Sequence, residues 1–410
     1  MSTKIHRFLH QWGGTTTIYF SFTHLGHDIC MGLLTALLPF IRADLGLSYL
    51  QSGLLLSSYA MTSGVSQLLG GWIGDRMDRQ KVMIAGLFGM GLAVIAVGLS
   101  STYHLMLVVF ILMGIIAGAY HPSAMSMVSE RFEEDRRGKA IALHSLGGST
   151  GFAIGPVVGG LIAGTLGWRY AFMILSVPAL AVIPIVITKL KSPSVPRVSH
   201  LTDTSMSERD TACDSTARHI NFGSVLLNLA FVGGLAIIIQ FATGSAMAFF
   251  PLYLVDKYAM TSTTASMWVG AVRGAGMVGT LLGGWLSDFW GRRKSVILAF
   301  AITGPILFAF SELPFNYALI AVWLFFGMLM HFRQSTVQPY LMSNTPPKYR
   351  ARVFGMYFGL GMEGQSLIQP VVGHFMDIIG IVRVYSLIAL SSLVLSAISL
   401  VMMKKLKNTQ

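Results

Sequence analysis

Long runs of apolar residues, separated by short clusters of charged residues, follow one another along the whole chain. A helix needs about 20 mostly apolar residues to cross the hydrocarbon of a membrane, and irregular backbone cannot face lipid, so such runs predict transmembrane helices. They do not alternate between polar and apolar residues as barrel strands do. We expect twelve spans, at about 16–41, 50–74, 82–101, 104–129, 138–165, 168–188, 223–255, 262–287, 295–311, 315–343, 352–376 and 381–403.

Positive charges are distributed unevenly among the loops between these runs. Most of the 29 lysines and arginines lie at the termini or in even-numbered loops. Because positive residues stay on the cytoplasmic side of a membrane, this pattern predicts that both termini are cytoplasmic. It also accounts for the formal net charge of +12, so we expect no nucleic-acid partner. The exceptions are Arg42, Arg169, Lys257 and Arg383 in odd-numbered loops, and Arg273 and Arg333 inside runs.

The composition indicates a membrane protein without enzymatic chemistry. Hydrophobic residues make up 53% of the chain and charged residues 11%, and the mean hydropathy is +0.65, so polar side chains are too few to cover a water-facing surface. We find no phosphate-binding loop before a strand, no zinc-ligand spacing and no nucleophile with a base. Cys30 and Cys213 lie in different environments. We therefore expect no enzyme, no cofactor, no metal site and no disulfide.

A polar segment divides the chain into two similar halves. From about residue 189 to 221 the hydrophobicity falls and charged, Ser, Thr and Pro residues dominate, which predicts a cytoplasmic linker. Pro-Val-Val-Gly at 156–159 recurs at 370–373. We expect a six-helix N-terminal bundle over 1–188, the linker over 189–221 and a six-helix C-terminal bundle over 222–410. Transporters built from such parallel repeats bind substrate near the bilayer midplane, between the halves.

A loop motif that occurs in both halves carries a family resemblance. Residues 71–81 read Gly-Trp-Ile-Gly-Asp-Arg-Met-Asp-Arg-Gln-Lys, and residues 284–294 read Gly-Trp-Leu-Ser-Asp-Phe-Trp-Gly-Arg-Arg-Lys. Both resemble the signature loop of the major facilitator superfamily, although Asp78 stands where that loop usually has glycine. The resemblance covers nearly the whole chain. It implies an all-α integral membrane protein of twelve transmembrane helices in two pseudo-symmetric six-helix bundles, which alternate access to a central site.

Each copy of this loop places an aspartate among arginines at a helix end. A carboxylate there can accept hydrogen bonds from the next helix start and pair with cations, and so can latch the inner ends of helices together in one conformation. The alternative is that these charges only mark topology. The candidate latch residues are Gly71, Asp75, Arg76, Arg79, Glu130, Arg137, Gly284, Asp288, Arg292 and Arg293.

Small residues recur at intervals of four in the fifth run, at Gly151, Gly155, Pro156, Gly159 and Gly160. Glycines at this spacing allow a neighbouring helix to approach closely, and the proline permits a bend. Ordinary helix packing is one explanation. The spacing also resembles the motif of the antiporter branch of the superfamily, which favours export.

Ionisable residues inside the runs are candidates for function, because a charge at the bilayer centre costs several kcal/mol. His24 and Asp28 lie four residues apart, on one helix face, where they can hydrogen-bond and handle a proton. We add His121 and Glu363 as candidate proton-coupling residues. Thr23-His24-Leu25 with Asp28, and Tyr120-His121-Pro122, resemble the fosmidomycin-resistance branch of the superfamily.

Arg273 lies midway along the eighth run with apolar residues on both sides, so it must pair or face water. Two interpretations remain open: Glu363 neutralises it in a structural ion pair, or it binds an anionic group of the substrate. His331, Gln334 and Gln338 share one face of the tenth run. The candidate substrate-binding residues are therefore Arg273, His331, Gln334, Gln338, Gln240 and Tyr357.

These features predict a secondary active transporter of the cytoplasmic (inner) membrane, because no ATP-binding motif is present and transport must use an existing gradient. The first hypothesis is proton-coupled efflux of small amphipathic or anionic compounds by rocking of the two halves. The alternative is a proton symporter or uniporter that imports an organic anion. The expected partners are a small-molecule substrate, protons and the lipid bilayer, and we expect a monomer.

Overall fold

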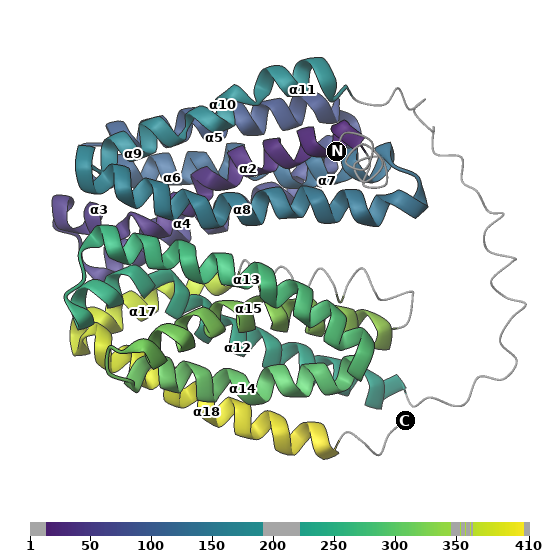
Figure 1. Cartoon of the computed structure of the whole chain (residues 1–410), viewed down its shortest axis with the longest axis vertical. Helices are drawn as coiled ribbons and strands as arrows, with labels where there is room; N and C mark the ends of the chain where they lie inside the picture. Colours follow the sequence, from purple (N-terminus) through teal and green to yellow (C-terminus); the bar gives the residue numbers. More distant parts are fainter. Residues whose placement is uncertain are drawn as a thin grey trace, which may run out of the picture.

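The computed structural model describes residues 14–191, 222–345, 353, 357, 361 and 364–405, and this part of the chain is built of α-helices (Figure 1). The helices are α2 (Gly14–Ala36), α3 (Leu38–Leu45), α4 (Tyr49–Arg76), α5 (Arg79–Leu99), α6 (Tyr103–Ala117), α7 (Tyr120–Arg131), α8 (Glu134–Leu166), α9 (Trp168–Leu175), α10 (Val177–Ala181), α11 (Ile183–Lys189), α12 (Phe222–Tyr258), α13 (Ser262–Trp290), α14 (Arg292–Glu312), α15 (Tyr317–Asn344), α17 (Gln365–Ile379) and α18 (Ile381–Lys405).

The helices lie in two groups (Figure 1). Helices α2 to α11 form the N-terminal group, and α12 to α18 form the C-terminal group. Within the groups α8 packs on α2, α13 on α15, and α14 on α18. Between the groups α13 packs on α8, and α17 packs on α4. Because the linker residues 192–221 lie outside the described residues, the boundaries expected for the two bundles stay predictions.

Equivalent positions in the two halves have the same backbone conformation, which agrees with an internal duplication. Gly167 ends α8 with φ of +100°, and Gly380 ends α17 with φ of +88°. Only glycine adopts this region without strain, so each position produces a sharp turn into the next helix. Pro156 lies inside α8 and Pro370 inside α17.

Among the described residues, eight helical segments are long and apolar enough to cross a membrane. They are 79–99, 103–131, 136–166, 168–189, 231–258, 292–312, 317–344 and 381–402. Helices α2, α4 and α13 also occupy expected runs but are more polar, since they carry the buried His and Asp residues, serine-rich turns and Arg273. The total of twelve spans and the cytoplasmic position of the termini therefore stay predictions.

Three expected runs are interrupted rather than continuous. A proline lies within the first turn of the helix that follows each break, where it lacks the N–H that would continue the hydrogen-bond ladder. The breaks fall at Leu37 before Pro39, at Gly118 and Ala119 before Pro122, and at Ser176 and Val182 before Pro178 and Pro184. Each break divides one run into consecutive helices.

The two groups meet at the end of the molecule that carries α3, which we call the α3 end. Asp377 accepts hydrogen bonds from the backbone N–H groups of Tyr49 (2.8 Å) and Leu50 (2.9 Å). Asp256 accepts from the Tyr49 hydroxyl and forms an ion pair with Arg42 at 3.5 Å. Ser266 Oγ of α13 also donates to the Ala36 oxygen of α2, at 2.6 Å. The molecule is therefore closed at the α3 end.

Candidate functional site

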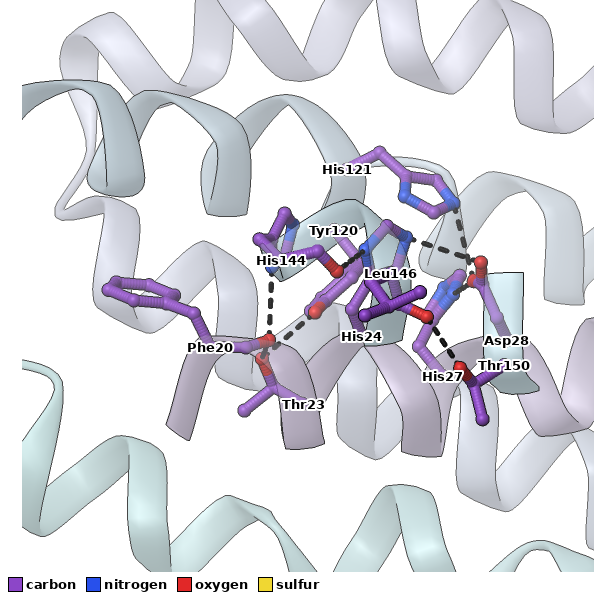
Figure 2. Close-up of polar contacts among 10 residues, drawn as sticks. All are labelled: Phe20, Thr23, His24, His27, Asp28, Tyr120, His121, His144, Leu146 and Thr150. Atoms are coloured by element: carbon purple, nitrogen blue, oxygen red, sulfur yellow. Dashed lines mark hydrogen bonds and ion pairs between the residues drawn. The ribbon is translucent and has the colours of Figure 1, made fainter. Parts of the chain in front are cut away.

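Asp28 lies at the centre of a histidine cluster inside the N-terminal group (Figure 2). The His24 Nε2 atom is 3.2 Å from Asp28 Oδ2, as their spacing of one helical turn predicts. His27 Nδ1 lies 2.8 Å from Asp28 Oδ1, and His121 Nε2 lies 3.8 Å from the same oxygen. Asp28 is only 3% exposed, so this buried carboxylate depends on the imidazoles for compensation.

The hydrogen bonds of His24 fix where its hydrogens lie. Its Nδ1 is 3.0 Å from the backbone oxygen of His144, and a carbonyl only accepts, so Nδ1 carries a hydrogen. A lone pair on Nε2 would repel the carboxylate it faces. The contact between His24 and Asp28 therefore holds one proton, shared between imidazole and carboxylate.

Other side chains hold the rings of the cluster in place. The ring of His144 stacks on that of His24 at 4.3 Å between centroids, and His144 Nδ1 donates to the Phe20 carbonyl at 3.0 Å. Tyr120 stacks on His27 at 4.4 Å, and its hydroxyl donates to Thr23 Oγ1 at 3.0 Å (Figure 2). These contacts come from α2, α7 and α8, so three helices fix the orientation of the rings.

The glycines of α8 allow this cluster to form. A Cβ atom on Gly148 would lie 2.5 Å from His24 Nε2 and 2.7 Å from Asp28 Oδ2. Cβ atoms on Gly151 and Gly155 would lie 2.6 Å from backbone oxygens of α2, and one on Gly159 would meet Leu33. Gly160 faces Ser266 of α13, and Pro156 lies against Gly32. The glycine motif of the fifth run thus packs α8 against both α2 and α13.

A cavity of about 300 Å³ lies between the two groups. Its size is at the low end for small-molecule sites. Thr35, Ser149 and Phe152 line it from the N-terminal group. The lining from the C-terminal group consists of Gln240, Gly244, Met247, Ala248, Arg273, Met330, His331, Gln334 and Gln369.

Arg273 is the cation of this cavity. Its guanidinium lies over the ring of Phe152, 4.8 Å from the ring centroid. Its Nε is buried, and no hydrogen-bond partner for it exists within the described ranges. Gln369 Oε1 is likewise buried and unpartnered there. Arg273 and Gln369 thus bring polar atoms without partners in the described structure to the wall of the cavity.

Arg333 has a different role from Arg273. Its guanidinium donates to Gln240 Oε1, to Thr243 Oγ1 at 3.2 Å and to the backbone oxygen of Ala236 at 3.2 Å. Arg333 is 1% exposed. It therefore links α15 to α12 and is a structural residue of the C-terminal group.

The cavity contains some of the residues expected from the sequence and excludes others. Gln240, Arg273, His331 and Gln334 line it. Gln338 and Tyr357 do not, and Tyr357 packs in an apolar cluster with Val232 and Phe300. Their role in substrate binding stays a prediction, because helical spacing alone does not show where a cavity ends. Glu363 lies outside the described residues, so its expected contact with Arg273 stays a prediction.

The first copy of the loop motif forms contacts within the N-terminal group. Arg79 forms an ion pair with Glu130 of α7, and the Arg137 Nε donates to the Phe132 oxygen at 3.3 Å. Asp78 caps α5 by accepting from the Gln80 N–H at 2.9 Å. Arg76 is exposed at the end of α4, whereas the side chains of Gly71 and Asp75 lie outside the described part of the structure.

The second copy is more open. Asp288 and Arg292 are exposed, and Asp288 has no hydrogen bond or ion pair to any residue in the described ranges. Gly284 has open space where a Cβ would lie, and Arg293 is half-buried. The role of these loop residues as a latch therefore stays a prediction.

His24, Asp28 and His121 also have the spacing of a metal site, since their ligand atoms lie within 4.8 Å of one another. Imidazole and carboxylate ligands suit zinc and related ions. Both Asp28 oxygens, however, already face imidazole nitrogens, and His121 would have to move closer to complete a coordination sphere. A proton fits the pair without any movement.

The helices, the central cavity and the buried charges define the class of protein: a multi-pass membrane transporter of small molecules, and not an enzyme. The chain belongs to the Major Facilitator Superfamily, whose sequence profile matches residues 20–368. This agrees with the resemblance of the loop motifs.

The chain is similar in sequence or in fold to several known transporters and resistance proteins. It is 25% identical to the uncharacterised MFS-type transporter YfnC of Bacillus subtilis over 87% of each chain. It is 26% identical to a probable hexose phosphate transport protein of Chlamydia muridarum, covering 75% of this chain and 67% of that protein. A puromycin resistance protein of Streptomyces alboniger is 30% identical over 35% of this chain and 29% of its own length. The crystal structure of a D-xylose–proton symporter shares the fold, with a TM-score of 0.77 at 15% identity over 96% of this chain and 97% of that one.

Sequence reasoning missed several residues of the site. His144 lies in the fifth run, 120 residues after His24, and no local pattern relates the two. Phe152, Met247 and Met330 look like ordinary core residues in the sequence. Gly148 was detectable in the sequence as a glycine one turn before Gly151 and two turns before Gly155. The side chains of His24 and Asp28, which occupy the space beside it, were not detectable.

Proposed function

We propose that this protein is a proton-coupled secondary transporter that moves small anionic or amphipathic compounds by a rocker-switch mechanism. One observation carries the proposal: a buried carboxylate that shares a proton with His24 lies beside Gly148 of α8, one helical turn from Phe152, which contacts the Arg273 guanidinium of the central cavity. Buried charges of this kind are costly in a membrane and mark ion and substrate pathways. His121, near Asp28, and Glu363 complete the proposed proton-coupling set.

The contacts between the groups support alternating access. The α3 end is closed by Asp377, Asp256 and Arg42, while the cavity lies between the groups. We place the α3 end outside the cell and both termini in the cytoplasm, following the distribution of Lys and Arg. Rocking would break the contacts of the α3 end and bring the inner ends together, where the loop motifs form the opposing latch. We place the protein in the inner membrane as a monomer.

Export is the first candidate direction. The glycine motif of α8 resembles that of the antiporter branch, and the cluster of His24, Asp28 and His121 resembles the fosmidomycin-resistance type of drug exporter. A relative named for puromycin resistance supports this direction. The glycines, however, also serve the packing of α8 on α2, so the motif alone does not require export.

Import of an organic anion with a proton is the second candidate, and Arg273 favours it. A guanidinium with an unpartnered Nε recognises carboxylate, phosphonate or phosphate groups. A relative named for hexose phosphate transport points to the same chemistry.

Proton coupling is tested in everted membrane vesicles with an imposed pH gradient. Compounds from an anionic and amphipathic library are added, and dissipation of the gradient is followed by a fluorescent amine. Vesicles with the wild-type protein should respond to at least one compound, and vesicles with Asp28→Asn should not. The matched control is Asp44→Asn, an exposed aspartate that pairs with Arg169 away from the cavity. A transported compound whose flux is unaffected by collapse of the gradient would remove proton coupling.

A further inference from the structure

Asp28 and Arg273 carry opposite charges and lie on either side of the boundary between the groups. Helix α8 lies beside both residues. Gly148 of α8 contacts His24 and Asp28, and Phe152 lies one helical turn further along, beneath the Arg273 guanidinium. Residues four apart share a helix face, so Asp28 and Arg273 lie along the same side of α8. Opposite charges on one side of a helix inside a buried site attract each other more strongly than they would in water.

The charge of the His24 and Asp28 pair depends on one proton. With the shared proton the pair is neutral, and without it the pair carries one negative charge. In the deprotonated state the pair balances Arg273 and repels an incoming anion. In the protonated state Arg273 is left without compensation from Asp28, and its attraction for an anion rises because charges interact strongly in a buried site.

The other ionisable groups around Asp28 do not reverse the effect of the proton on the attraction of Arg273 for an anion. His27 Nδ1 donates to Asp28 Oδ1, and His144 Nδ1 donates to a backbone oxygen. Taking on a further proton at any of these rings would also make the site more positive. Within the described residues the groups that face Asp28 are His24, His27 and Cys30 from α2, Tyr120 and His121 from α7, His144 from α8 and Arg273 from α13.

We propose that a proton and an organic anion bind this site together, so that the protein carries them in the same direction as a symporter; this rests on the proton-coupled transport proposed above. Coupling between two ligands is reciprocal: if the proton strengthens anion binding, the anion strengthens proton binding to the same degree. Exchange of an anion for a proton would require the opposite coupling, in which the proton weakens anion binding. A cationic substrate, by contrast, competes with the proton and is carried by antiport.

The cavity further defines the anion. Arg273 binds the acidic group, a carboxylate, phosphonate or phosphate ester. Gln369 Oε1, buried and without a partner among described residues, accepts a hydrogen bond and so selects a ligand with a hydroxyl or N–H group. Phe152, Met247 and Met330 give the remaining wall an apolar character. The substrate class is a small organic anion with one acidic group, a hydrogen-bond donor and an apolar side.

The direction of proton movement tests the sign of the coupling. Proteoliposomes containing the purified protein and an internal pH dye receive benzoate, 4-hydroxybenzoate, methylphosphonate, glucose 6-phosphate or, as a cation, puromycin in the external solution. Empty liposomes give the passive leak, which is subtracted. The proposal expects at least one anion to acidify the lumen, because protons enter with it.

The outcomes separate this inference from the proposed function. Lumenal alkalinisation by an anion, or a pH change with puromycin alone, overturns proton–anion symport and leaves proton coupling intact. The absence of a pH change with every compound contradicts the proposed function itself.

Variants test the residues. Asp28→Asn imitates the protonated pair, so the anion that acidifies the lumen should still bind the detergent-purified variant within about threefold of wild type, without proton uptake and without dependence on pH. Arg273→Gln should weaken binding of that anion at least about tenfold, and Asp44→Asn should behave as wild type. Loss of anion binding in a folded Asp28→Asn protein equal to that in Arg273→Gln would overturn the proposal. His24→Gln provides a second variant of the pair if Asp28→Asn fails to fold.

Discussion

Asp377 of the C-terminal group accepts a hydrogen bond from the backbone N–H of Tyr49 in the N-terminal group, at 2.8 Å. Its second oxygen accepts from the next N–H, so one side chain caps the first turn of a helix in the opposite half of the molecule. The N-terminal N–H groups of a helix have no partners within the helix, and a carboxylate there also interacts favourably with the helix dipole. The stability of the α3 end therefore depends on this side chain.

Asp377→Ala should open the α3 end. Loss of a capping side chain costs about 0.5–2 kcal/mol, which is enough to shift a two-state equilibrium several-fold. Spin labels at the exposed positions Ala43 and Ala259 report the distance between the groups. We expect a larger population at long distance in the variant. His374→Ala, on the same helix and without a hydrogen bond across the boundary in the described structure, is the control; equal distributions in both variants would contradict the role of Asp377.

Gly148→Ala should disturb the proton pair. The new Cβ would lie 2.5 Å from His24 Nε2, so either the imidazole or α8 must move. Overpacking of this kind costs about 1–3 kcal/mol. We expect a lower melting temperature and loss of gradient-driven transport.

Gly138→Ala provides a matched control on the same helix, because a Cβ at Gly138 meets no atom within 4 Å. Alanine is favoured over glycine inside a helix by about 0.5–1 kcal/mol, so this variant should be unchanged or slightly more stable. Similar losses in both glycine variants would mean that helix propensity, and not contact with His24, explains the effect.

The two buried arginines should respond in opposite ways to replacement by glutamine. Arg333→Gln removes hydrogen bonds between α15 and α12, and we expect a stability loss of about 2–4 kcal/mol, seen as a lower melting temperature in detergent. Arg273→Gln removes a buried charge whose Nε has no partner among the described residues, so stability should be retained while transport is lost. A large stability loss in Arg273→Gln would indicate a structural ion pair instead.

Asp78→Gly should be tolerated, whereas Asp78→Ala should lower the stability of the protein by more. Asp78 is the N-cap of α5, and glycine is an acceptable N-cap that costs only a few tenths of a kcal/mol, whereas alanine costs about 0.5–2 kcal/mol. Thermal unfolding of the purified variants measures this order. The reverse order would show that helix propensity, rather than the cap, decides stability at this position.

Local spacing predicted one part of the site and could not predict the rest. His24 and Asp28 are neighbours on one helix, so their contact follows from the sequence alone. The carbonyl of His144 that fixes the hydrogen of His24 comes from another helix, and its position depends on how closely α8 approaches α2. The sequence likewise placed Arg273 and Arg333 in similar apolar surroundings. Only the packing of α12 against α15 shows that Arg333 is bound by Gln240 and Thr243 while Arg273 faces the cavity.

The contact of α2 with α8 has a consequence for how a proton would move. The glycines at 147, 151 and 155 leave backbone against backbone, with no flexible side chain at these points between the helices that could relax during a conformational change. Both helices belong to the N-terminal group, so in the proposed mechanism the shared proton of His24 and Asp28 would stay inside one stiff unit while the groups rock. The N-terminal group would then carry the proton from one aqueous side to the other, and no transfer along a chain of acceptor groups would be needed.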